Sequence, residues 1–307
     1  MVLIKNYSYI ISSFAFKFSE ILVAFLKVLH NFMSIITLTT DFGLKDHFVG
    51  ALKGKILSCF GEAVIVDISH YVDLFNISQA SYIVGAAYSS FPAGTVHLIG
   101  VDAELTNESR HIAMQWNGHY FICADNGILS LLTEKIIPEK IVEINIHSRQ
   151  PEGATEMDVF ITVACHLAKG GLLNVIGKEI TDIKQIHDLH PVVATDNSAI
   201  KGCVVYIDHF GNCVTNLTKK QVREIGKGRD FEITFSTKTI KGIKSGYSDF
   251  TVNERFSLKD YEGEKLAIFN EAGFLEIAIF RSNPQTVGTA KTLLGLKFRD
   301  VVSVVFK

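Results

Sequence analysis

The sequence predicts an α/β protein: an N-terminal, mainly parallel sheet with helices on both faces, followed by a C-terminal β-barrel-like domain. From Ile35 onward, short β-branched runs alternate with helical segments. That rhythm requires crossover connections and therefore a parallel sheet. Beyond about residue 198 the alternation stops, and short strands follow one another with glycine-containing turns between them.

Composition places the chain among ordinary globular proteins. Of its 307 residues, 48% are hydrophobic and 20% are charged, which is enough apolar material for two domains. The 30 basic residues nearly balance the 32 acidic ones, for a formal net charge of −2, so we expect no nucleic-acid partner. The 5 cysteines are scattered without close pairs, which indicates reduced thiols, a cytoplasmic protein and no metal site.

The first 32 residues are interpreted as an extension upstream of the natural start, because Met33 runs directly into a predicted strand. Their apolar run, residues 9–29, is interrupted by Lys17, Glu20 and Lys27, so we expect no membrane partner. An amphipathic surface helix or a membrane anchor are the alternatives. The chain is thus divided into an extension at 1–32, an α/β domain at 33–190 and a β-rich domain at 198–307.

Hydrophobic periodicity and turn signals predict the elements of the α/β domain. Strands are predicted at the runs IITLT, AVIVDIS and TVHLIGV, and helices at residues 46–60, 77–91 and 158–168. Asn117-Gly118, between two further strand-like runs, predicts a type I′ hairpin, which we expect at or near a sheet edge.

The β-rich domain is predicted to begin near Ala199, after a polar and irregular stretch. Its strands are the runs GCVVYI, FEITF, KLAIF, FLEIAIF and SVVF. Short strands at this spacing are typical of a small barrel or sandwich.

Two carboxylates follow the first predicted strand, at the edge of an open α/β sheet where ligands bind. Asp41 comes directly after that strand, and Asp46 stands at the start of the next helix. A carboxylate accepts hydrogen bonds from a vicinal diol and favours an ammonium or sulfonium charge. The alternative is structural, with Asp46 capping the helix and Asp41 holding a turn.

A third carboxylate, Asp102, ends the third predicted strand and belongs to the same edge, with Arg110 just before the hairpin. A carboxylate and a guanidinium together can polarise a water molecule. The alternative is that Asp102 accepts hydrogen bonds from loop amides and that Arg110 is solvated.

In the β-rich half, the stretch from Asp208 to Asn212 connects two strand-like runs. The Asn212 amide can pair with the edge of adenine, and Phe210 can stack on the face of the base. The alternative is a turn in which Asp208 and Asn212 bond their own backbone.

Seven blocks of the sequence occur in a fixed order between Met33 and the C-terminus. They are TTDFGLKDHFVGALKGKIL, AVIVDISH, FPAGTVHLIGVD, ADNGILSLL, DVFITVACHLAKGG, YIDHFGNCVTNL and NEAGFLEIAI. Together they resemble the S-adenosylmethionine hydroxide adenosyltransferases, relatives of the fluorinating and chlorinating enzymes. The resemblance implies hydrolysis of S-adenosylmethionine to adenosine and methionine by attack of water or hydroxide at C5′, without a cofactor. It also implies a homotrimer with active sites between the N domain of one subunit and the C domain of its neighbour.

The resemblance further implies which residues bind the ligand. In the N domain, Asp41 would take the ribose hydroxyls, Asp46 would take the methionine ammonium, and Phe75 would pack beside the sugar. The C domain would hold the adenine and methionine portions with four residues: Asp208, Phe210, Asn212 and Glu276.

The family's water-activating Asp, Arg and His are only partly kept. Asp102 is present, but gap-free alignment places Ser109 at the first Arg of the family loop and Arg110 at the second. Thr155 stands at the His and Glu156 at the residue after it. The candidate catalytic residues are therefore Asp102, Arg110 and Glu156. Glu156 is either a substitute base or a solvated residue at a helix start. The missing His leaves a non-catalytic S-adenosylmethionine- or adenosine-binding protein as the alternative function.

Overall fold

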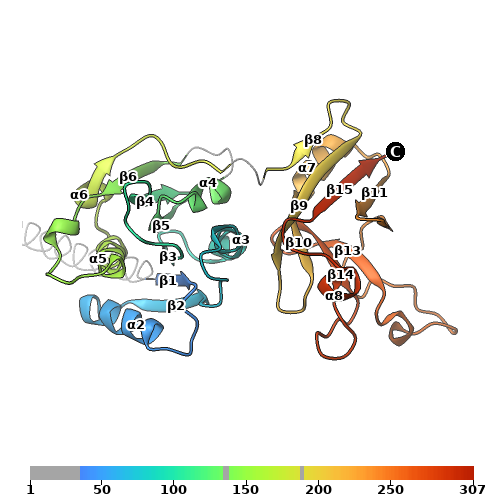
Figure 1. Ribbon diagram of the computed structural model, residues 1–307, viewed down its shortest axis with the longest axis horizontal. Coiled ribbons are helices and arrows are strands. Elements are labelled where there is room, and N and C mark those ends of the chain that lie inside the picture. Colours follow the sequence, from blue (N-terminus) through green and yellow to red (C-terminus); the bar gives the residue numbers. More distant parts are fainter. Residues whose placement is uncertain (1–34, 134–137, 187–189) are drawn as a thin grey trace, which may run out of the picture. The chain divides into compact units, whose positions relative to one another are not determined.

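The computed structural model describes residues 35–133, 138–186 and 190–307, which form two compact units (Figure 1). One unit contains residues 35–76, 88–126 and the described part of 135–183. The other contains residues 77–87, 127–133 and the described part of 184–307. The interpretation of residues 1–32 as an extension lies outside the described residues. Within the described part of the chain, every helix is too short or too polar to cross a membrane.

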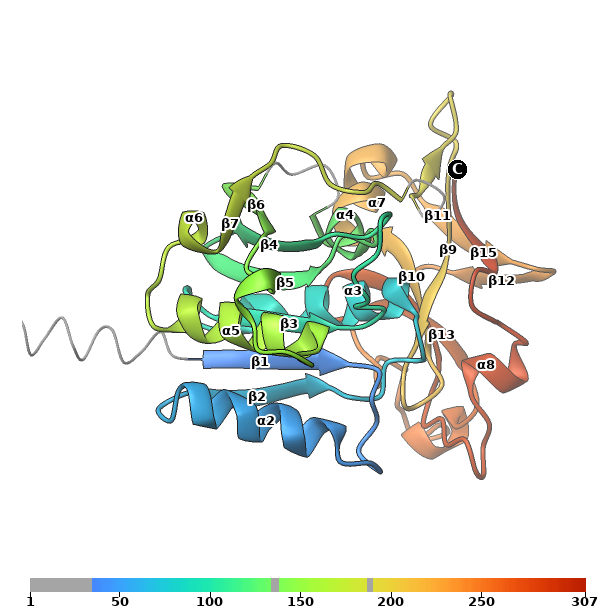
Figure 2. The same ribbon diagram turned by 60° about the vertical axis from the view of Figure 1, so that its left-hand side comes forward.

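The first unit is built on a seven-stranded sheet in the order β2-β1-β3-β5-β4-β6-β7. Strands β2, β1, β3 and β5 are parallel and lie side by side (Figure 2), whereas β4 and β7 run antiparallel to their neighbours. The mainly parallel sheet predicted from the sequence is confirmed. Its strands are β1 (Ile35–Thr40), β2 (Val64–Ser69), β3 (Val96–Gly100), β4 (His111–Trp116), β5 (His119–Ala124), β6 (Lys140–Ile144) and β7 (Gly177–Glu179).

The hairpin predicted at Asn117-Gly118 joins β4 to β5. The two residues have φ angles of 50° and 75°, as a type I′ turn requires. Its expected position at or near a sheet edge is wrong. Strand β5 pairs with β3, and β4 pairs with β6, because β6 and β7 extend the sheet beyond the hairpin.

Helices α2 (Phe48–Cys59) and α5 (Glu156–Ala168) pack against each other, and α5 contacts β1, β3 and β5. Both begin or end within two residues of the ranges predicted from hydrophobic periodicity. A shorter helix, α6 (Leu173–Ile176), precedes β7. The core between the helices and the sheet is apolar and buried, and includes Ile36, Leu38, Leu52, Ile56, Leu98, Ile122, Phe160 and Val163.

The second unit contains an antiparallel sheet in the order β12-β11-β15-β9-β10-β14-β13, with β8 beside β9. Its two ends approach each other where Lys244 N donates to Ala267 O over 2.8 Å, so the sheet is nearly closed and the barrel-like prediction is confirmed. Helices α7 (Lys219–Gly226) and α8 (Ala290–Leu293) complete it. The strands are β8 (Val192–Val193), β9 (Ala199–Ile207), β10 (Cys213–Thr218), β11 (Phe231–Phe235), β12 (Lys238–Lys241), β13 (Lys265–Phe269), β14 (Phe274–Ile279) and β15 (Val301–Phe306).

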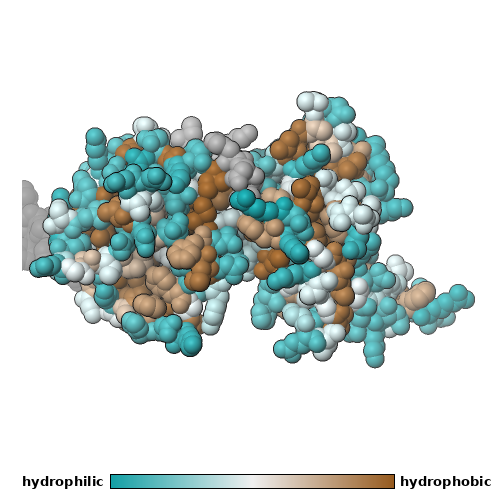
Figure 3. All heavy atoms as spheres, viewed as in Figure 1, coloured by the Kyte–Doolittle hydropathy of each residue, from teal (hydrophilic) through white to brown (hydrophobic). Residues whose placement is uncertain are grey.

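Two helices from the N-terminal half of the chain also belong to the second unit: α3 (Ile77–Ala87) and α4 (Ile128–Thr133). Helix α3 packs against α4 and β9, and Tyr82 of α3 stacks on Tyr206 of β9 with ring centroids 4.8 Å apart. The predicted helix at 77–91 ends early, at Ala87, and continues as a 3-10 turn. Over the visible face of both units, apolar side chains form small groups among hydrophilic ones (Figure 3).

Gly177 and Gly54 give a matched pair of stability predictions. A Cβ at Gly177 would lie 2.1 Å from the Glu143 carbonyl oxygen, so Gly177→Ala should lower the free energy of unfolding by about 1–3 kcal/mol. Gly54 lies exposed in α2 with nothing within 4 Å of an added Cβ. Gly54→Ala should therefore raise stability by about 0.5–1 kcal/mol through helix propensity. Urea unfolding measures both, and equal stabilities would contradict the close β6–β7 packing.

Candidate active site

The strand order of the first unit reverses at β1, because the chain passes from β1 to β2 on one side and returns to β3 on the other. Open α/β sheets bind ligands at the carboxyl ends of strands beside such a reversal. Helix α5 begins at this edge. A Cβ added to Gly100 of β3 would lie 3.0 Å from the Met157 sulfur and 3.3 Å from Thr40 Cγ2. The ends of β1 and β3 and the first turn of α5 are therefore in contact.

Asp41 joins the loop after β1 to the loop before α3. Its Oδ2 accepts a hydrogen bond from the Phe75 backbone N over 2.9 Å, and Phe75 has a φ of 60° and a side chain that is 69% exposed. The structure thus brings together two of the predicted ligand-binding residues. Asp41 Oδ2 thus has the structural role that the alternative expected, because its hydrogen bond holds the loop. Among the described residues no hydrogen bond to Oδ1 is formed.

The loop after β1 is also held by a buried histidine that sequence reasoning missed. His70 Nδ1 lies 2.7 Å from Thr40 Oγ1, and His70 O accepts from Gly43 N over 2.7 Å. Gly43 has a φ of 66°, which favours glycine. Asp46 is exposed and is not the helix cap, since α2 begins at Phe48 with His47 as its N-cap.

Asp102 follows β3 with a φ of 48° and an exposed side chain. The amide of Asn126, a residue at the end of β5, donates to Val101 O over 3.1 Å and to Asp102 O over 2.9 Å. The backbone at Asp102 is therefore fixed while its carboxylate faces solvent.

Arg110 contacts three carboxylates other than Asp102. Its Nε donates to Asp125 over 3.0 Å, one terminal nitrogen donates to Asp182 over 2.8 Å, and the other lies 3.5 Å from Glu143. The guanidinium thus joins the end of β5 to the segment after β7. Ser109, which gap-free alignment places at the first Arg of the family loop, has a buried Oγ without a hydrogen-bond partner among the described residues.

Thr155, at the position of the family His, is the N-cap of α5. Its backbone N and its Oγ1 each donate to Asp158 Oδ2 over 2.9 Å. Glu156 follows in the first turn of the helix and is half-buried, where the helix dipole favours a carboxylate. Glu156 therefore stands at a helix start, as the structural alternative expected. Its side chain is half-buried, whereas that alternative expected it to be solvated.

Two histidines beside Glu156 were also missed by sequence reasoning. His111 Nε2 lies 2.9 Å from Ala103 O, and His111 Nδ1 lies 3.0 Å from His147 Nε2. The edge of the Phe160 ring packs on His111, with centroids 4.6 Å apart. The only sequence feature that could have indicated His111 is its position next to Arg110. His147 stands in an irregular segment, and no sequence pattern indicated it.

In the second unit, Asp208 and Asn212 close the turn between β9 and β10. Asp208 Oδ1 accepts from Asn212 N over 2.8 Å, and Oδ2 accepts from Asn212 Nδ2 over 2.9 Å. The backbone-bonded turn considered as an alternative is thus present. Phe210 is 58% exposed on this turn. The Asn212 Oδ1 atom is buried and has no hydrogen-bond partner among the described residues.

A chain of polar side chains continues from Asn212 to α3. Asn212 Nδ2 lies 3.4 Å from the Tyr247 hydroxyl, which donates to Glu276 Oε1. Asn270 Nδ2 donates to Glu276 Oε2 over 3.3 Å and to the Tyr82 hydroxyl over 3.0 Å. Burial raises the pKa of Glu276, and the Asp208 carboxylate adds to that rise. Asn270 belongs to one of the quoted blocks, whereas Tyr82 and Tyr247 had no sequence signal.

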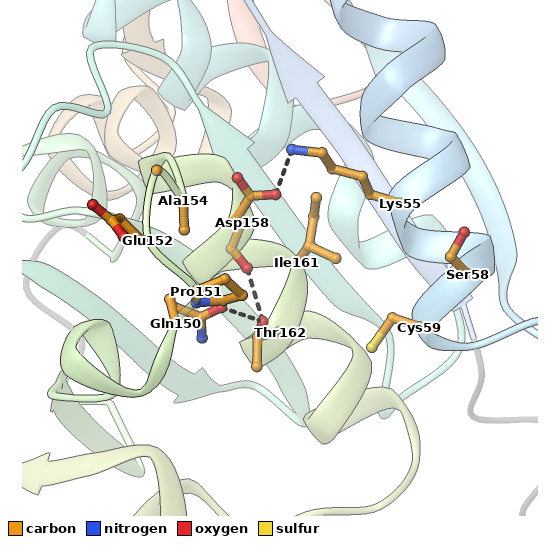
Figure 4. A pocket seen from close by; sticks show the side chains of 11 residues that line it. Lys55, Ser58, Cys59, Gln150, Pro151, Glu152, Ala154, Asp158, Ile161 and Thr162 are labelled. Atoms are coloured by element: carbon orange, nitrogen blue, oxygen red, sulfur yellow. Dashed lines mark hydrogen bonds and ion pairs between the residues drawn. The ribbon is translucent and has the colours of Figure 1, made fainter.

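A separate hollow of 520 Å³ lies between α2 and α5 (Figure 4). Its lining includes the Lys55–Asp158 ion pair, and Gln150 and Thr162 meet on its other side. None of the candidate catalytic or ligand-binding residues lines it. The hollow is therefore distinct from the edge formed by β1 and β3.

Comparison with known proteins decides the family. The SAM hydroxide adenosyltransferase N-terminal domain matches residues 36–177, and the C-terminal domain of the same family matches residues 202–303. The chain belongs to the SAM hydroxide adenosyltransferase family. It is 29% identical over 285 residues to an (R)-S-adenosyl-L-methionine hydrolase of Methanocaldococcus jannaschii, covering 90% of this chain and 97% of the relative.

Two further similarities agree with the family. A fluorinase of an Actinoplanes species is 22% identical over 273 residues, covering 80% of this chain and 90% of that enzyme. The crystal structure of an uncharacterized conserved protein from Thermotoga maritima superposes with a TM-score of 0.74 at 29% identity, covering 88% of this chain and 99% of that one. The same family fold is therefore found in a solved structure.

The buried carboxyl of Glu276 gives a pH-dependent prediction. Because burial raises its pKa above the ordinary value of 4.5, the folded state holds this proton more tightly than the unfolded state. The resulting stability is fully present below pH 4.5 and is lost as the pH rises through the raised pKa. Glu276→Gln removes this titration, so the variant should gain stability relative to the parent as the pH rises. Thermal unfolding of both proteins between pH 4.5 and 8 measures the difference, and the opposite trend would contradict the burial.

Proposed function

We propose that the chain hydrolyses S-adenosylmethionine to adenosine and methionine. The observation that carries this proposal is the family match over both domains, residues 36–177 and 202–303. In the reaction, a water oxygen forms a bond to C5′ while the C5′–sulfur bond breaks and its electron pair returns to sulfur. The leaving group is a neutral thioether and needs no protonation, so the protein acts mainly on the water.

The two polar clusters suit the parts of this substrate. Asp41 Oδ2 is bonded to Phe75 N, so Oδ1 would accept the ribose hydroxyls and the exposed Phe75 ring would pack beside the sugar, while Asp46 would take the methionine ammonium. A buried acceptor without a donor costs ~1–3 kcal/mol, and the amino group of adenine would satisfy Asn212 Oδ1. Phe210, exposed on the same turn, would stack on the base.

Carboxylates favour the cationic substrate and disfavour an anionic nucleophile. Asp208 and Glu276 lie in one polar chain and would attract the sulfonium and the methionine ammonium. Glu156, half-buried in the first turn of α5, would repel a halide ion. This charge distribution supports water over halide as the nucleophile.

Asp102 is the proposed orienting group for that water. Its backbone is held by Asn126 and its carboxylate is exposed at the edge of the sheet. Holding water in line within ~3–3.5 Å of the carbon supplies several kcal/mol by proximity alone. Arg110 would act indirectly, by fixing the segments that carry Asp125 and Asp182.

The proposal includes a cytoplasmic homotrimer, as the resemblance implies. None of the five cysteines, at positions 59, 123, 165, 203 and 213, forms a disulfide, which supports a reducing compartment. A trimer would bring the N domain of one subunit to the C domain of its neighbour. Light scattering of the purified protein tests the assembly.

The central experiment mixes purified protein with S-adenosylmethionine and follows the products by chromatography. Adenosine and methionine should appear in equal amounts. Binding of adenosine without any product would support the non-catalytic alternative and contradict the proposal. Asp41→Asn and Asn212→Ala should each weaken adenosine binding about 5- to 150-fold, the equivalent of one unpaired buried group. Asp196→Asn, in an exposed loop, is the matched control.

Asp102→Asn should lower turnover at least ~10²-fold, the usual scale for a lost acid–base or orienting group, with little change in substrate affinity. Asparagine tolerates the positive φ of this residue, so the fold should be kept. Steady-state kinetics on a preparation free of nucleosidases measures kcat and KM. Full activity in this variant would place the water elsewhere.

A further inference from the structure

The His111–His147 pair has its protons fixed by a backbone carbonyl. Ala103 O can only accept, so His111 Nε2 carries the hydrogen of their 2.9 Å contact. A neutral His111 then has its lone pair on Nδ1, which accepts from His147 Nε2 over 3.0 Å. His147 must therefore carry its hydrogen on Nε2 and its lone pair on Nδ1. The hydrogen bonds of the described residues do not engage that Nδ1.

The surroundings of His147 are those of a base rather than of a core residue. His147 is half-buried, and the described residues contain no group of three ligands that could make the pair a metal site. The other histidine pair of this sheet, His97 and His119, is buried, and burial lowers the pKa of His97 to about 3. His97 also bonds Thr37 over 2.7 Å, so that pair is enclosed in the core.

Charged groups from two elements face the pair. Burial lowers the pKa of His147, while Glu156 of α5 and Glu143 of β6 oppose that effect. Burial also lowers the pKa of His111; the Ala103 carbonyl and Glu156 oppose this, and His147 adds to it. Burial thus favours the neutral form of both rings, and the neighbouring carboxylates would stabilise an imidazolium once it forms.

The pair is also linked to residues that adjoin the proposed water site. Ala103, which His111 binds, directly follows Asp102. Glu156 directly precedes Met157, which packs on Gly100 at the end of β3. Thr155, at the position expected for the family His, caps α5. The imidazoles near this edge therefore come from β4 and from the segment after β6.

We infer that His147, oriented by His111, is the general base that takes the proton from the attacking water. This inference rests on the proposed hydrolysis. As the water oxygen bonds to C5′ and the C5′–sulfur electron pair returns to sulfur, one water proton passes to His147 Nδ1. The imidazolium is held beside Glu156 and Glu143 and then releases the proton to solvent. His111 is a positioning residue, and Glu156 assists by its charge and is not the base.

The test measures adenosine release from S-adenosylmethionine across pH 5 to 9 for the parent, four test variants and one control variant. His147→Gln should lower kcat at least ~10²-fold at every pH with little change in KM. Glu156→Gln should lose ~10-fold or less, and its acid limb should move to lower pH, because the charge that favours the imidazolium is gone. His111→Gln should retain more activity than His111→Leu, since only the glutamine amide can both accept from His147 and donate to Ala103 O.

His166→Gln is the control, because His166 is a half-buried histidine at the far end of α5 that bonds Leu172 O; its rate should equal that of the parent. Circular dichroism confirms that each variant is folded. Parental activity in His147→Gln would overturn the inference while leaving the hydrolysis standing. A pH-independent loss in Glu156→Gln, with His147→Gln active, would make Glu156 the base. If the parent binds adenosine but releases none, the proposed function fails and the inference fails with it.

Discussion

The first turn of α5 packs closely on the carboxyl edge of the sheet at Gly100. A Cβ at that position would lie 3.0 Å from the Met157 sulfur, a tight contact that would require the Met157 side chain to shift. The contact sets where Glu156 stands relative to the ends of β1 and β3. The edge that carries Asp41 and Asp102 and the helix that carries Glu156 therefore form one surface.

Thr155, which gap-free alignment places at the family His, has a structural role at the start of α5. In a capping box the residue three positions after the N-cap accepts from the N-cap amide, and Asp158 Oδ2 here accepts from both the backbone N and the hydroxyl of Thr155. The helix start is thus capped, and the imidazoles proposed to act at this edge come from β4 and from the segment after β6. The proposed base would therefore stand at a different sequence position from the family His.

The second unit handles buried charge by a continuous chain of hydrogen bonds. Glu276 is 3% exposed, and an isolated buried carboxylate is costly. Tyr247 and Asn270 donate to its two oxygens, and the chain runs on to Asn212 and Tyr82. Such a network holds its members in one arrangement when every donor is paired. Among the described residues Asn212 Oδ1 has no partner in this network, and a hydrogen-bond donor on the ligand would supply one.

The sequence by itself determined the elements and the family. Hydrophobic periodicity and capping are local, so the strand at Ile35, the helix ending at Ala168 and the Asn117-Gly118 turn could be read from neighbouring residues. The same local signals placed Asp41 and Asp102 at strand ends. Asn212 and Glu276 were predicted as ligand-binding residues from the family blocks, because hydrophobic periodicity does not distinguish them.

Only the tertiary structure decided which of these residues meet. The hairpin lies inside the sheet, because the pairing of β6 with β4 joins segments whose local patterns carry no information about strand order. Arg110 binds Asp125 and Asp182 for the same reason. His111 and His147 are separated by 36 residues and become neighbours only when β4 and β6 pair. Side-chain contacts across a sheet depend on strand order and register, and these are set by long-range packing that a local sequence pattern does not contain.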